Sequence, residues 1–184
     1  MIIDIRGSHG SGKSHIVHSI LHNKVQHSIL RDDLLVGIFV PELSLAILGD
    51  YSVNCGGCDQ IRTADEICQR VREFAGMKEV KHVLLEGILV AHTFQRYSDL
   101  ANEMDEYVFC FIEVPLVECV RRVRARRVER GKKPDFDLFH ITADHKRIHQ
   151  RLPTKFIEAG HRVVYIDGST GDAGTRRILE LLNE

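Results

Sequence analysis

A glycine-rich segment near the start of the chain has the residue types and spacing of a phosphate-binding loop. Residues 7–14 read Gly-Ser-His-Gly-Ser-Gly-Lys-Ser and match G-x-x-x-x-G-K-[ST]. Glycines let the backbone wrap around a phosphate, and a helix that begins there adds positive potential. In this pattern Lys13 neutralises the β- and γ-phosphates of ATP and Ser14 binds Mg²⁺. The residues expected at the nucleotide are Gly7, Ser8, His9, Gly10, Ser11, Gly12, Lys13, Ser14 and His15. His15 lies either beside the phosphate oxygens or on the helix surface.

Two acidic residues are placed to do chemistry beside this loop. Glu86 follows the apolar pair Leu84-Leu85, at the end of a strand where ligands bind in open α/β sheets. It could orient water on Mg²⁺ or accept a proton from an attacking hydroxyl, and the alternative is an ordinary acid at a strand end. Asp59 follows a loop with two glycines, which permit a backbone path close to a ligand. Asp59 could therefore act as the general base, and the alternative is a tight structural loop.

Cysteine and histidine residues raise the question of a metal site. Cys55 and Cys58 have the spacing of half a zinc site, but the sequence offers no second matched pair. Buried cysteines in a tight loop are the alternative. His140, His145 and His149 do not share one helical face, so we expect surface or partly packed residues and no metal cluster.

The segment 28–49 contains β-rich runs separated by Asp32-Asp33 and by Pro41-Glu42, which predicts a small antiparallel meander. The triplet Arg-Asp-Asp at 31–33 resembles the base motif of polynucleotide 5′-kinases, which makes Asp32 a further candidate base. The flanking apolar runs favour a hairpin turn at this point.

A helix rich in arginine is predicted between 116 and 130. Residues 117–133 include eight basic and two acidic residues, a local charge of +6. Arg126 and Arg127 lie nearest the break at Gly131, and we expect them in a lid that neutralises charge on a transferring phosphoryl group. A solvated helix face is the alternative, and gripping a polynucleotide backbone is a second use for the same residues.

Composition limits the class of protein. The chain has 184 residues, with 25 Lys and Arg against 26 Asp and Glu, and 43% of its residues are hydrophobic. This length suits one α/β domain, and a net charge of −1 excludes a uniformly basic nucleic-acid coat. Five cysteines without a secretory signal predict an intracellular, cytoplasmic protein. The longest apolar stretch, residues 34–49, is too short and interrupted to span a membrane.

The order of predicted elements alternates between strands and helices. Continuous apolar runs predict central strands, and amphipathic or basic segments predict helices between them. The strands are expected at 2–5, 83–85, 108–112 and 162–166. The helices are expected after the glycine-rich loop with 16–21 on its apolar face, from 63 with an apolar stripe to 74, at 116–130, near 140–159, and in a last segment ending at 182. Such alternation indicates an α/β fold with a parallel central sheet and helices on both faces.

Four segments carry a family resemblance. GSHGSGKS, NCGGCDQIRTADEIC, LLEGILV and RRVRARRVERGKKP together are similar to phage-encoded P-loop kinases, and more specifically to the 5-hydroxymethyluracil DNA kinases. The resemblance runs through most of the chain. It implies a fold like that of nucleoside monophosphate kinases, with residues 1–184 as one kinase domain. In that domain, 28–49 is a β-meander insertion and 121–138 is the arginine-rich lid.

The resemblance also implies a reaction. The γ-phosphoryl group of ATP would pass to the 5-hydroxymethyl group of hydroxymethyluracil in phage DNA, a step in DNA hypermodification in the host cytoplasm. Lys13 and Ser14 would hold ATP and Mg²⁺, Asp59 or Glu86 would activate the hydroxyl, and Arg126 and Arg127 would hold phosphates. The alternatives are a small-molecule deoxynucleotide or nucleoside kinase, a polynucleotide 5′-kinase, and a non-catalytic nucleotide-binding switch.

Overall fold

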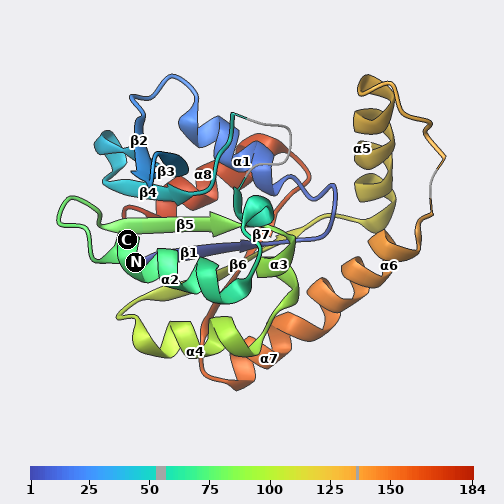
Figure 1. Cartoon of the computed structure of the whole chain (residues 1–184). Coiled ribbons are helices and arrows are strands. Elements are labelled where there is room, and N and C mark those ends of the chain that lie inside the picture. Colours follow the sequence, from blue (N-terminus) through green and yellow to red (C-terminus); the bar gives the residue numbers. More distant parts are fainter. Residues whose placement is uncertain (53–56, 136) are drawn as a thin grey trace.

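The computed structural model describes residues 1–52, 57–135 and 137–184, which form a seven-stranded sheet covered by helices (Figure 1). The strands are β1 (Ile2–Arg6), β2 (His27–Arg31), β3 (Leu34–Val40), β4 (Leu45–Leu48), β5 (His82–Glu86), β6 (Tyr107–Glu113) and β7 (Arg162–Asp167). Their order in the sheet is β2-β3-β4-β5-β1-β6-β7. All neighbours from β4 to β7 are parallel, whereas β3 pairs antiparallel with both β2 and β4. The predicted α/β fold with a small antiparallel part is confirmed.

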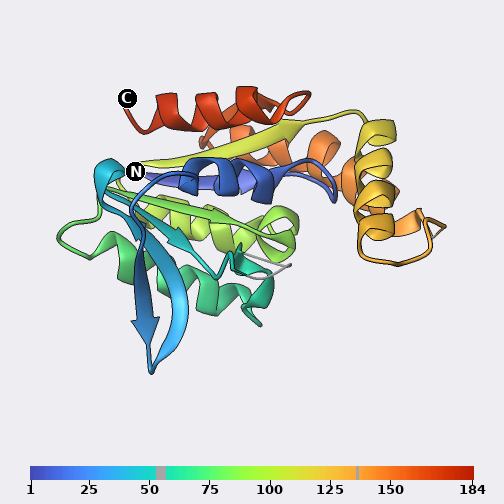
Figure 2. The same ribbon diagram turned by 90° about the horizontal axis from the view of Figure 1, so that it is seen from above.

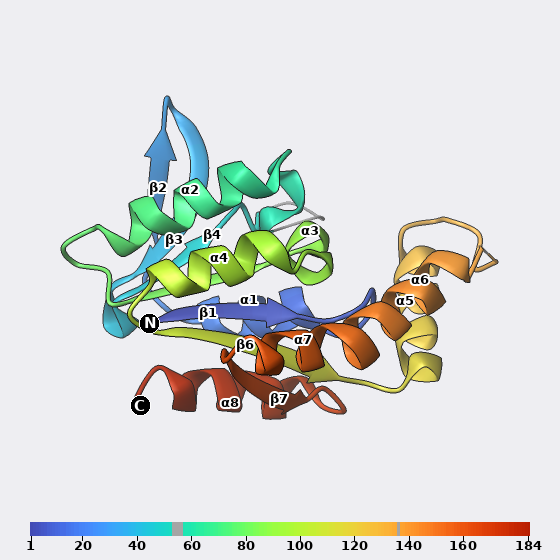
Figure 3. The same ribbon diagram turned by 90° about the horizontal axis from the view of Figure 1, so that it is seen from below.

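Helices cover both faces of this sheet (Figures 2 and 3). They are α1 (Lys13–Leu21), α2 (Ala64–Ala75), α3 (Ile88–His92), α4 (Gln95–Glu103), α5 (Leu116–Glu129), α6 (Phe139–Lys146), α7 (Leu152–Glu158) and α8 (Gly171–Leu181), with the short turns η1 (Pro41–Leu43) and η2 (Gly57–Gln60) and the π-helical turn η3 (Arg147–Arg151). The core on one face is built from α1 and α8, and that on the other from α2, α3, α4 and α7. Among the described residues, no helix is long and apolar enough to cross a lipid bilayer.

Two helical regions stand at the carboxyl ends of the parallel strands. The arginine-rich helix α5 projects from the body of the molecule, as the right side of Figure 1 shows. After it, α6, η3 and α7 run on as one long helix interrupted by the π turn (Figure 3). The predicted helices at 116–130 and near 140–159 are thereby confirmed, and α3 and α4 are two helices that the sequence analysis did not predict.

The β2–β3 hairpin reaches outward from the edge of the sheet (Figure 2). Asp32 and Asp33 form its two-residue turn, with φ values of 50° and 62°. Successive residues with positive φ match the twist of a tight hairpin, so the hairpin interpretation is correct. Both aspartates are exposed at the tip, where Leu30 and Leu34 are also exposed. Asp32 therefore does not line the cavity at the glycine-rich loop.

An ion pair with no solvent exposure lies in the core beneath the phosphate loop. Alternation along β1 turns Asp4 and Arg6 toward the face that α3, α4 and α7 cover. Arg6 Nη2 lies 2.7 Å from Asp4 Oδ2, and both side chains are fully buried. The Tyr107 hydroxyl donates a hydrogen bond of 3.0 Å to Asp4, and Arg6 Nη1 donates one of 2.8 Å to the Thr93 carbonyl. The pair thus connects β1 to β6 and to the segment between α3 and α4.

Aromatic rings enclose the guanidinium of Arg6. Its central carbon lies 4.9 Å from the ring centre of Tyr97, 5.0 Å from that of Phe109 and 4.6 Å from that of Phe156. Burial acts to raise the pKa of Asp4, and Arg6 and Tyr107 act in the opposite direction. The Asp4 carboxylate therefore depends on these two partners to remain charged.

We expect Arg6→Gln to lower the free energy of unfolding by about 3–5 kcal/mol, because the variant leaves Asp4 buried without its counter-charge. Urea denaturation measures this loss. Arg31→Gln is the matched control, since it breaks a partly exposed pair with Glu73 and should cost less than about 1 kcal/mol. Equal losses in the two variants would contradict the structural importance of the buried pair.

Candidate functional site

The phosphate loop connects β1 to α1 and closes around its own lysine. Gly12 precedes the helix with φ of 102°, a left-handed conformation that suits glycine. Lys13 Nζ donates hydrogen bonds to the carbonyls of Gly7 (2.9 Å) and Ser8 (3.3 Å). Burial lowers the pKa of Lys13, and the negative charges of Glu86 and Asp59 oppose that shift. The loop therefore holds a cation at its centre, as its sequence pattern predicts.

The loop also packs tightly against the first turns of α5. Gly10 has φ of 80°, and a Cβ atom added there would lie 2.4 Å from the carbonyl oxygen of Cys119. The Ser8 hydroxyl lies 3.5 Å from Cys119 Sγ. Glycine at position 10 is therefore required both by the backbone conformation and by this close approach.

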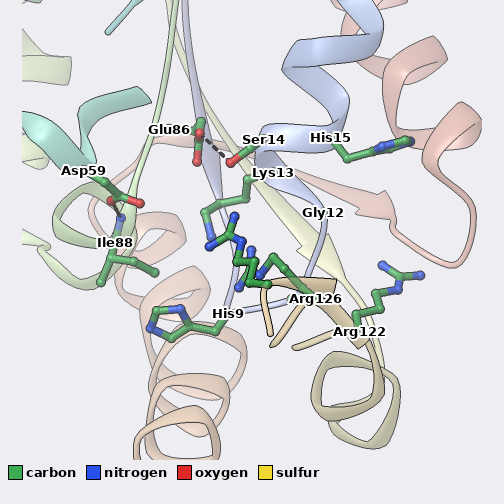
Figure 4. A pocket seen from close by; sticks show the side chains of 12 residues that line it. His9, Gly12, Lys13, Ser14, His15, Asp59, Glu86, Ile88, Arg122 and Arg126 are labelled. Carbon is green, nitrogen blue, oxygen red and sulfur yellow. Dashed lines mark hydrogen bonds between the residues drawn. The ribbon is translucent and has the colours of Figure 1, made fainter. Parts of the chain in front are cut away.

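A cavity of about 380 Å³ opens beside the loop (Figure 4). It brings together side chains that the sequence analysis selected in four separate segments, namely Lys13, Ser14, Asp59, Glu86 and Arg126. His9, Gly10, Gly12 and His15 of the predicted loop line it as well. Gly7 and Ser8 contribute the carbonyls that hold Lys13. The cavity combines positive charge for phosphates with carboxylates that could bind a cation or take up a proton.

Glu86 is the buried carboxylate of this cavity, with 1% of its surface exposed. Its Oε1 accepts hydrogen bonds from the Ser14 hydroxyl (3.0 Å) and from the Tyr51 hydroxyl (3.3 Å). Its Oε2 is buried and has no hydrogen-bond partner among the described residues. Burial raises the pKa of Glu86, and the positive charge of Lys13 opposes this. A carboxylate paired with Ser14 and holding an unsatisfied oxygen is a suitable oxygen ligand for Mg²⁺.

Gly57 permits the approach of η2 to Glu86. It has φ of 67°, and a Cβ atom there would lie 2.7 Å from Glu86 Oε1 and 2.8 Å from the Tyr51 hydroxyl oxygen. Tyr51 carries no sequence signal of its own, and only the fold reveals its contact with Glu86. This close approach explains why the second of the two residues between Cys55 and Cys58 is glycine.

Asp59 is the accessible carboxylate. It lies in η2 and its Oδ1 accepts a hydrogen bond of 2.6 Å from the backbone N–H of Ile88, at the start of α3. Its side chain borders the cavity and is exposed, in contrast to Glu86. Because Ile88 fixes one oxygen, the other is available to a bound molecule.

The cysteine loop gives no sign of a metal centre in the part that the structure describes. Cys55 lies outside the described residues, and Cys58 is a buried free cysteine. Burial raises the pKa of the Cys58 thiol well above its usual value, so the sulfur remains protonated. Within the described ranges, no group of three or more His, Cys, Asp or Glu side chains is placed to hold a metal ion.

The arginines of α5 fall into two groups, according to whether or not their position on the helix faces the cavity. Arg122, Arg126 and Arg130 recur every four residues and line the cavity. Arg127 lies one residue out of phase with this row, and its Nε donates a hydrogen bond of 2.9 Å to the Lys133 carbonyl. The structure therefore brings Arg126 to the cavity and engages Arg127 with the segment that follows α5.

Arg122 is a residue whose contacts the sequence analysis missed. Its Nη2 donates to the Gly168 carbonyl (2.9 Å) and its Nη1 to the Ser11 carbonyl (3.4 Å). These contacts form one side of a second cavity of about 300 Å³, which includes Gly171 and shares His15 with the first. The four-residue spacing of Arg122, Arg126 and Arg130 predicts that they share one helix face, but it does not predict which carbonyls Arg122 contacts.

Asp144 joins the phosphate loop to two other elements. Its Oδ2 lies 3.4 Å from His9 Nε2, and its Oδ1 lies 3.2 Å from His92 Nε2. Burial lowers the pKa of His9 and of His92, and the charge of Asp144 opposes this shift. Asp144 on α6 therefore contacts both the loop and α3, and nothing in the sequence pattern pointed to it.

Two further histidines pack together behind this cluster. His145 Nε2 lies 2.9 Å from the Val114 carbonyl oxygen, and its ring centre lies 4.5 Å from that of His149. Burial lowers the pKa of His149 to about 4, with a further contribution from His145. These contacts are packing interactions of α6 and η3.

Comparison with characterised proteins identifies two relatives. A 5-hmdU DNA kinase of Pseudomonas phage PaMx11 is 30% identical over 187 aligned positions, which cover 97% of each chain. A 5-hmdU DNA kinase of Delftia phage PhiW-14 is 28% identical over 177 positions, which cover 89% of this chain and 67% of the relative. No protein-family model matches the chain.

We expect Lys13→Ala to weaken the binding of a nucleoside triphosphate by about 10- to 100-fold, because the variant removes from the cavity the cation that would donate charged hydrogen bonds to phosphate. Isothermal titration calorimetry measures the change. Lys24→Ala is the control, since Lys24 pairs with Glu42 and does not line the cavity. Unchanged affinity in Lys13→Ala would contradict the assignment of the phosphate site.

Acidification should destabilise the protein through His149. Its pKa is about 4 in the folded chain against an ordinary value of 6.5, so the unfolded chain binds the proton more readily. Stability is therefore lost as pH falls from about 6.5 toward 4. Urea midpoints measured across this range should fall less steeply in His149→Gln than in the wild type or in His22→Gln, a control at an exposed position. Identical slopes in all three proteins would refute this assignment.

Proposed function

Because this chain belongs to the family of phage 5-hmdU DNA kinases, we propose that it transfers the γ-phosphoryl group of ATP to the 5-hydroxymethyl group of hydroxymethyluracil in phage DNA. Membership in a kinase family makes the chain a phosphotransferase that uses a nucleotide. The DNA acceptor, the donor ATP and the residue roles below are parts of the proposal. Phage DNA as acceptor would place the reaction in the cytoplasm of the host cell.

The observation that carries the proposal is the joint presence of the phosphate loop, two carboxylates and Arg126 in one cavity. The triphosphate of ATP would lie along the loop, with Lys13 beside the β- and γ-phosphates. The nucleoside would occupy the adjoining cavity bounded by His15, Arg122 and Gly171. The two cavities share His15 and Arg122, which suits one elongated ligand.

Ser14 and Glu86 would hold Mg²⁺ beside the phosphates. The unsatisfied Oε2 of Glu86 and the Ser14 hydroxyl provide the hard oxygen ligands that this cation prefers. When bound, Mg²⁺ neutralises negative charge on the β- and γ-phosphates. This role for Glu86 leaves the accessible Asp59 as the general base.

Asp59 would take the proton of the hydroxymethyl group while the hydroxymethyl oxygen attacks the γ-phosphorus. A new bond from phosphorus to oxygen forms, the bond to the β-phosphate oxygen breaks, and ADP leaves with the electron pair. Arg126 would stabilise the negative charge of the transferring group. Residues 1–184 would work as one kinase domain, in which the segment 121–138 acts as the lid.

A phosphate-transfer assay with labelled ATP and Mg²⁺ tests the proposal. The acceptors are DNA containing 5-hydroxymethyluracil, matched thymine DNA, and a panel of free nucleosides and nucleotides. Label on the modified DNA, with none on thymine DNA, is the expected result. Label confined to a free nucleotide would replace the DNA acceptor by a small molecule, and bound ATP without transfer to any acceptor would contradict the proposed reaction.

We expect Asp59→Asn to lower kcat with modified DNA by about 10²- to 10⁴-fold, because the amide cannot accept the proton. The KM for ATP should change little, since Asp59 contacts α3 and not the phosphate loop. Steady-state kinetics measure both constants. Asp172→Asn, at an exposed position on α8, is the control. An unchanged kcat in Asp59→Asn would exclude Asp59 as the base.

Glu86→Gln should behave differently from Asp59→Asn. The amide remains able to accept from Ser14 but loses the charge that binds a cation, so the Mg²⁺ concentration needed for half-maximal rate should rise. Titration of the rate with Mg²⁺ measures this requirement. A Mg²⁺ requirement equal to that of the wild type would contradict the metal role of Glu86.

A further inference from the structure

A strongly basic groove, separate from the two cavities described above, runs beside the phosphate cavity. It has a volume of about 460 Å³ and lies between the α3–α4 segment and the long helix α6–η3–α7, which adjoin in Figures 1 and 3. We define this basic groove by Lys146, Arg147, Arg151, Lys155, His92 and Phe94. No acidic residue of the described chain lines it.

The four cations of the basic groove have no acidic ion-pair partner among the described residues. Lys146, Arg147, Arg151 and Lys155 are exposed, and none of them forms an ion pair with the described residues. Lys155 Nζ lies over the ring of Phe94, 5.7 Å from its centre. Four cations gathered without an ion-pair partner among these residues create a positive potential that favours the binding of a polyanion.

The spacing of these cations suits an extended anion. At the α-helical rise of about 1.5 Å per residue, Arg151 and Lys155 lie about 6 Å apart along the axis, and Arg147 lies four residues earlier at the start of the π turn. Duplex DNA carries one negative charge per about 1.7 Å of its axis, so this row faces several phosphates. The row begins in η3, and π-helical turns occur frequently at functional sites.

The arginine-rich helix α5 offers fewer available cations than its sequence suggests. Arg121 and Arg122 both pair with Glu118, and Arg127 donates to the Lys133 carbonyl. Arg126 faces the phosphate cavity. The local charge of +6 already counts Glu118, but Arg122 and Arg126 line the phosphate cavity and Arg127 is engaged by the following segment. The basic groove therefore offers a separate surface for a nucleic-acid backbone.

Contacts at Asp144 place the groove next to the phosphate cavity. His92 lines the groove and His9 lines the phosphate cavity, and Asp144 lies within 3.4 Å of both. A strand whose phosphates lie in the groove would consequently pass close to the cavity that holds Asp59 and Lys13. That is the position required of DNA whose own base is the acceptor.

We propose that the basic groove binds the phosphate backbone of the DNA that carries the target base. This inference rests on the proposed function, and it adds the surface that distinguishes a DNA acceptor from a free nucleoside. Arg147 and Arg151 are binding residues in it and take no part in the transfer of the phosphoryl group.

The double variant Arg147→Gln/Arg151→Gln tests the proposal. Lys78→Gln/Arg176→Gln is the matched control, because it removes the same charge from exposed positions outside the groove. Fluorescence anisotropy with labelled DNA measures affinity over a series of salt concentrations. Steady-state kinetics compare modified DNA with free 5-hydroxymethyldeoxyuridine, which carries no phosphate, and calorimetry measures ATP affinity.

We expect the groove variant to bind DNA at least about tenfold more weakly and to show a salt dependence shallower by about 1.5 in the slope of log K against log salt. Its KM for modified DNA should rise in proportion. ATP affinity and any turnover of the free nucleoside should match the wild type and the control, since the groove contacts neither ligand.

Three results would overturn the inference. DNA affinity and salt slope equal to those of the control would show that the backbone binds elsewhere, while transfer to modified DNA by the wild type would leave the proposed function standing. Equal losses with DNA and with ATP would assign Arg147 and Arg151 to the nucleotide site instead. If the wild type neither bound DNA nor transferred phosphate to it, the proposed function would fail, and this inference with it.

Discussion

The arrangement of this molecule depends on two opposite charges that have no access to water. Asp4 and Arg6 lie on the strand that leads into the phosphate loop. Their removal from solvent carries a desolvation cost, which is offset because each satisfies the other and further partners satisfy the rest. The guanidinium of Arg6 donates a hydrogen bond to the carbonyl of Thr93, between α3 and α4, and packs on the ring of Phe156 in α7. Thus α3, which borders the cavity, and α7, which borders the basic groove, contact one buried group.

The charged side chains of the candidate site are also paired within the protein, but some of their polar atoms have no partner among the described residues. Lys13 is held by loop carbonyls and Glu86 by two hydroxyls, so the charged groups keep their positions in the absence of ligand. One oxygen of Glu86 is left without a partner among the described residues, and Asp59 has one oxygen fixed by backbone. Groups that are already oriented need little rearrangement when phosphate arrives, which is the condition for strong electrostatic stabilisation.

Sequence patterns predicted the secondary structure that depends on interactions between neighbouring residues. The strand–loop–helix unit at residues 2–21, the central strands and the hairpin at Asp32 depend on residues close in sequence, and their secondary structure was predicted correctly. The contact of Tyr51 with Glu86 and that of Asp144 with His9 join segments far apart in the chain, and no spacing rule encodes them. Composition also overstated the free charge of α5, because a count of arginines does not reveal which of them the protein itself engages. The basic groove was missed for the converse reason, since its cations are dispersed among apolar and polar residues.

The π turn has a consequence for how this chain can change over evolutionary time. A π-helical turn contains one residue more than the α-helical turn it replaces, so the helix after η3 is rotated relative to the helix before it. Deleting one residue from η3 would restore regular geometry and turn α7 by about 100°. Phe156 would then leave the ring cluster around Arg6, and Lys155 would leave its place over Phe94. Substitutions at the exposed positions of η3 are therefore tolerable in the fold, whereas its length is fixed by the packing on either side.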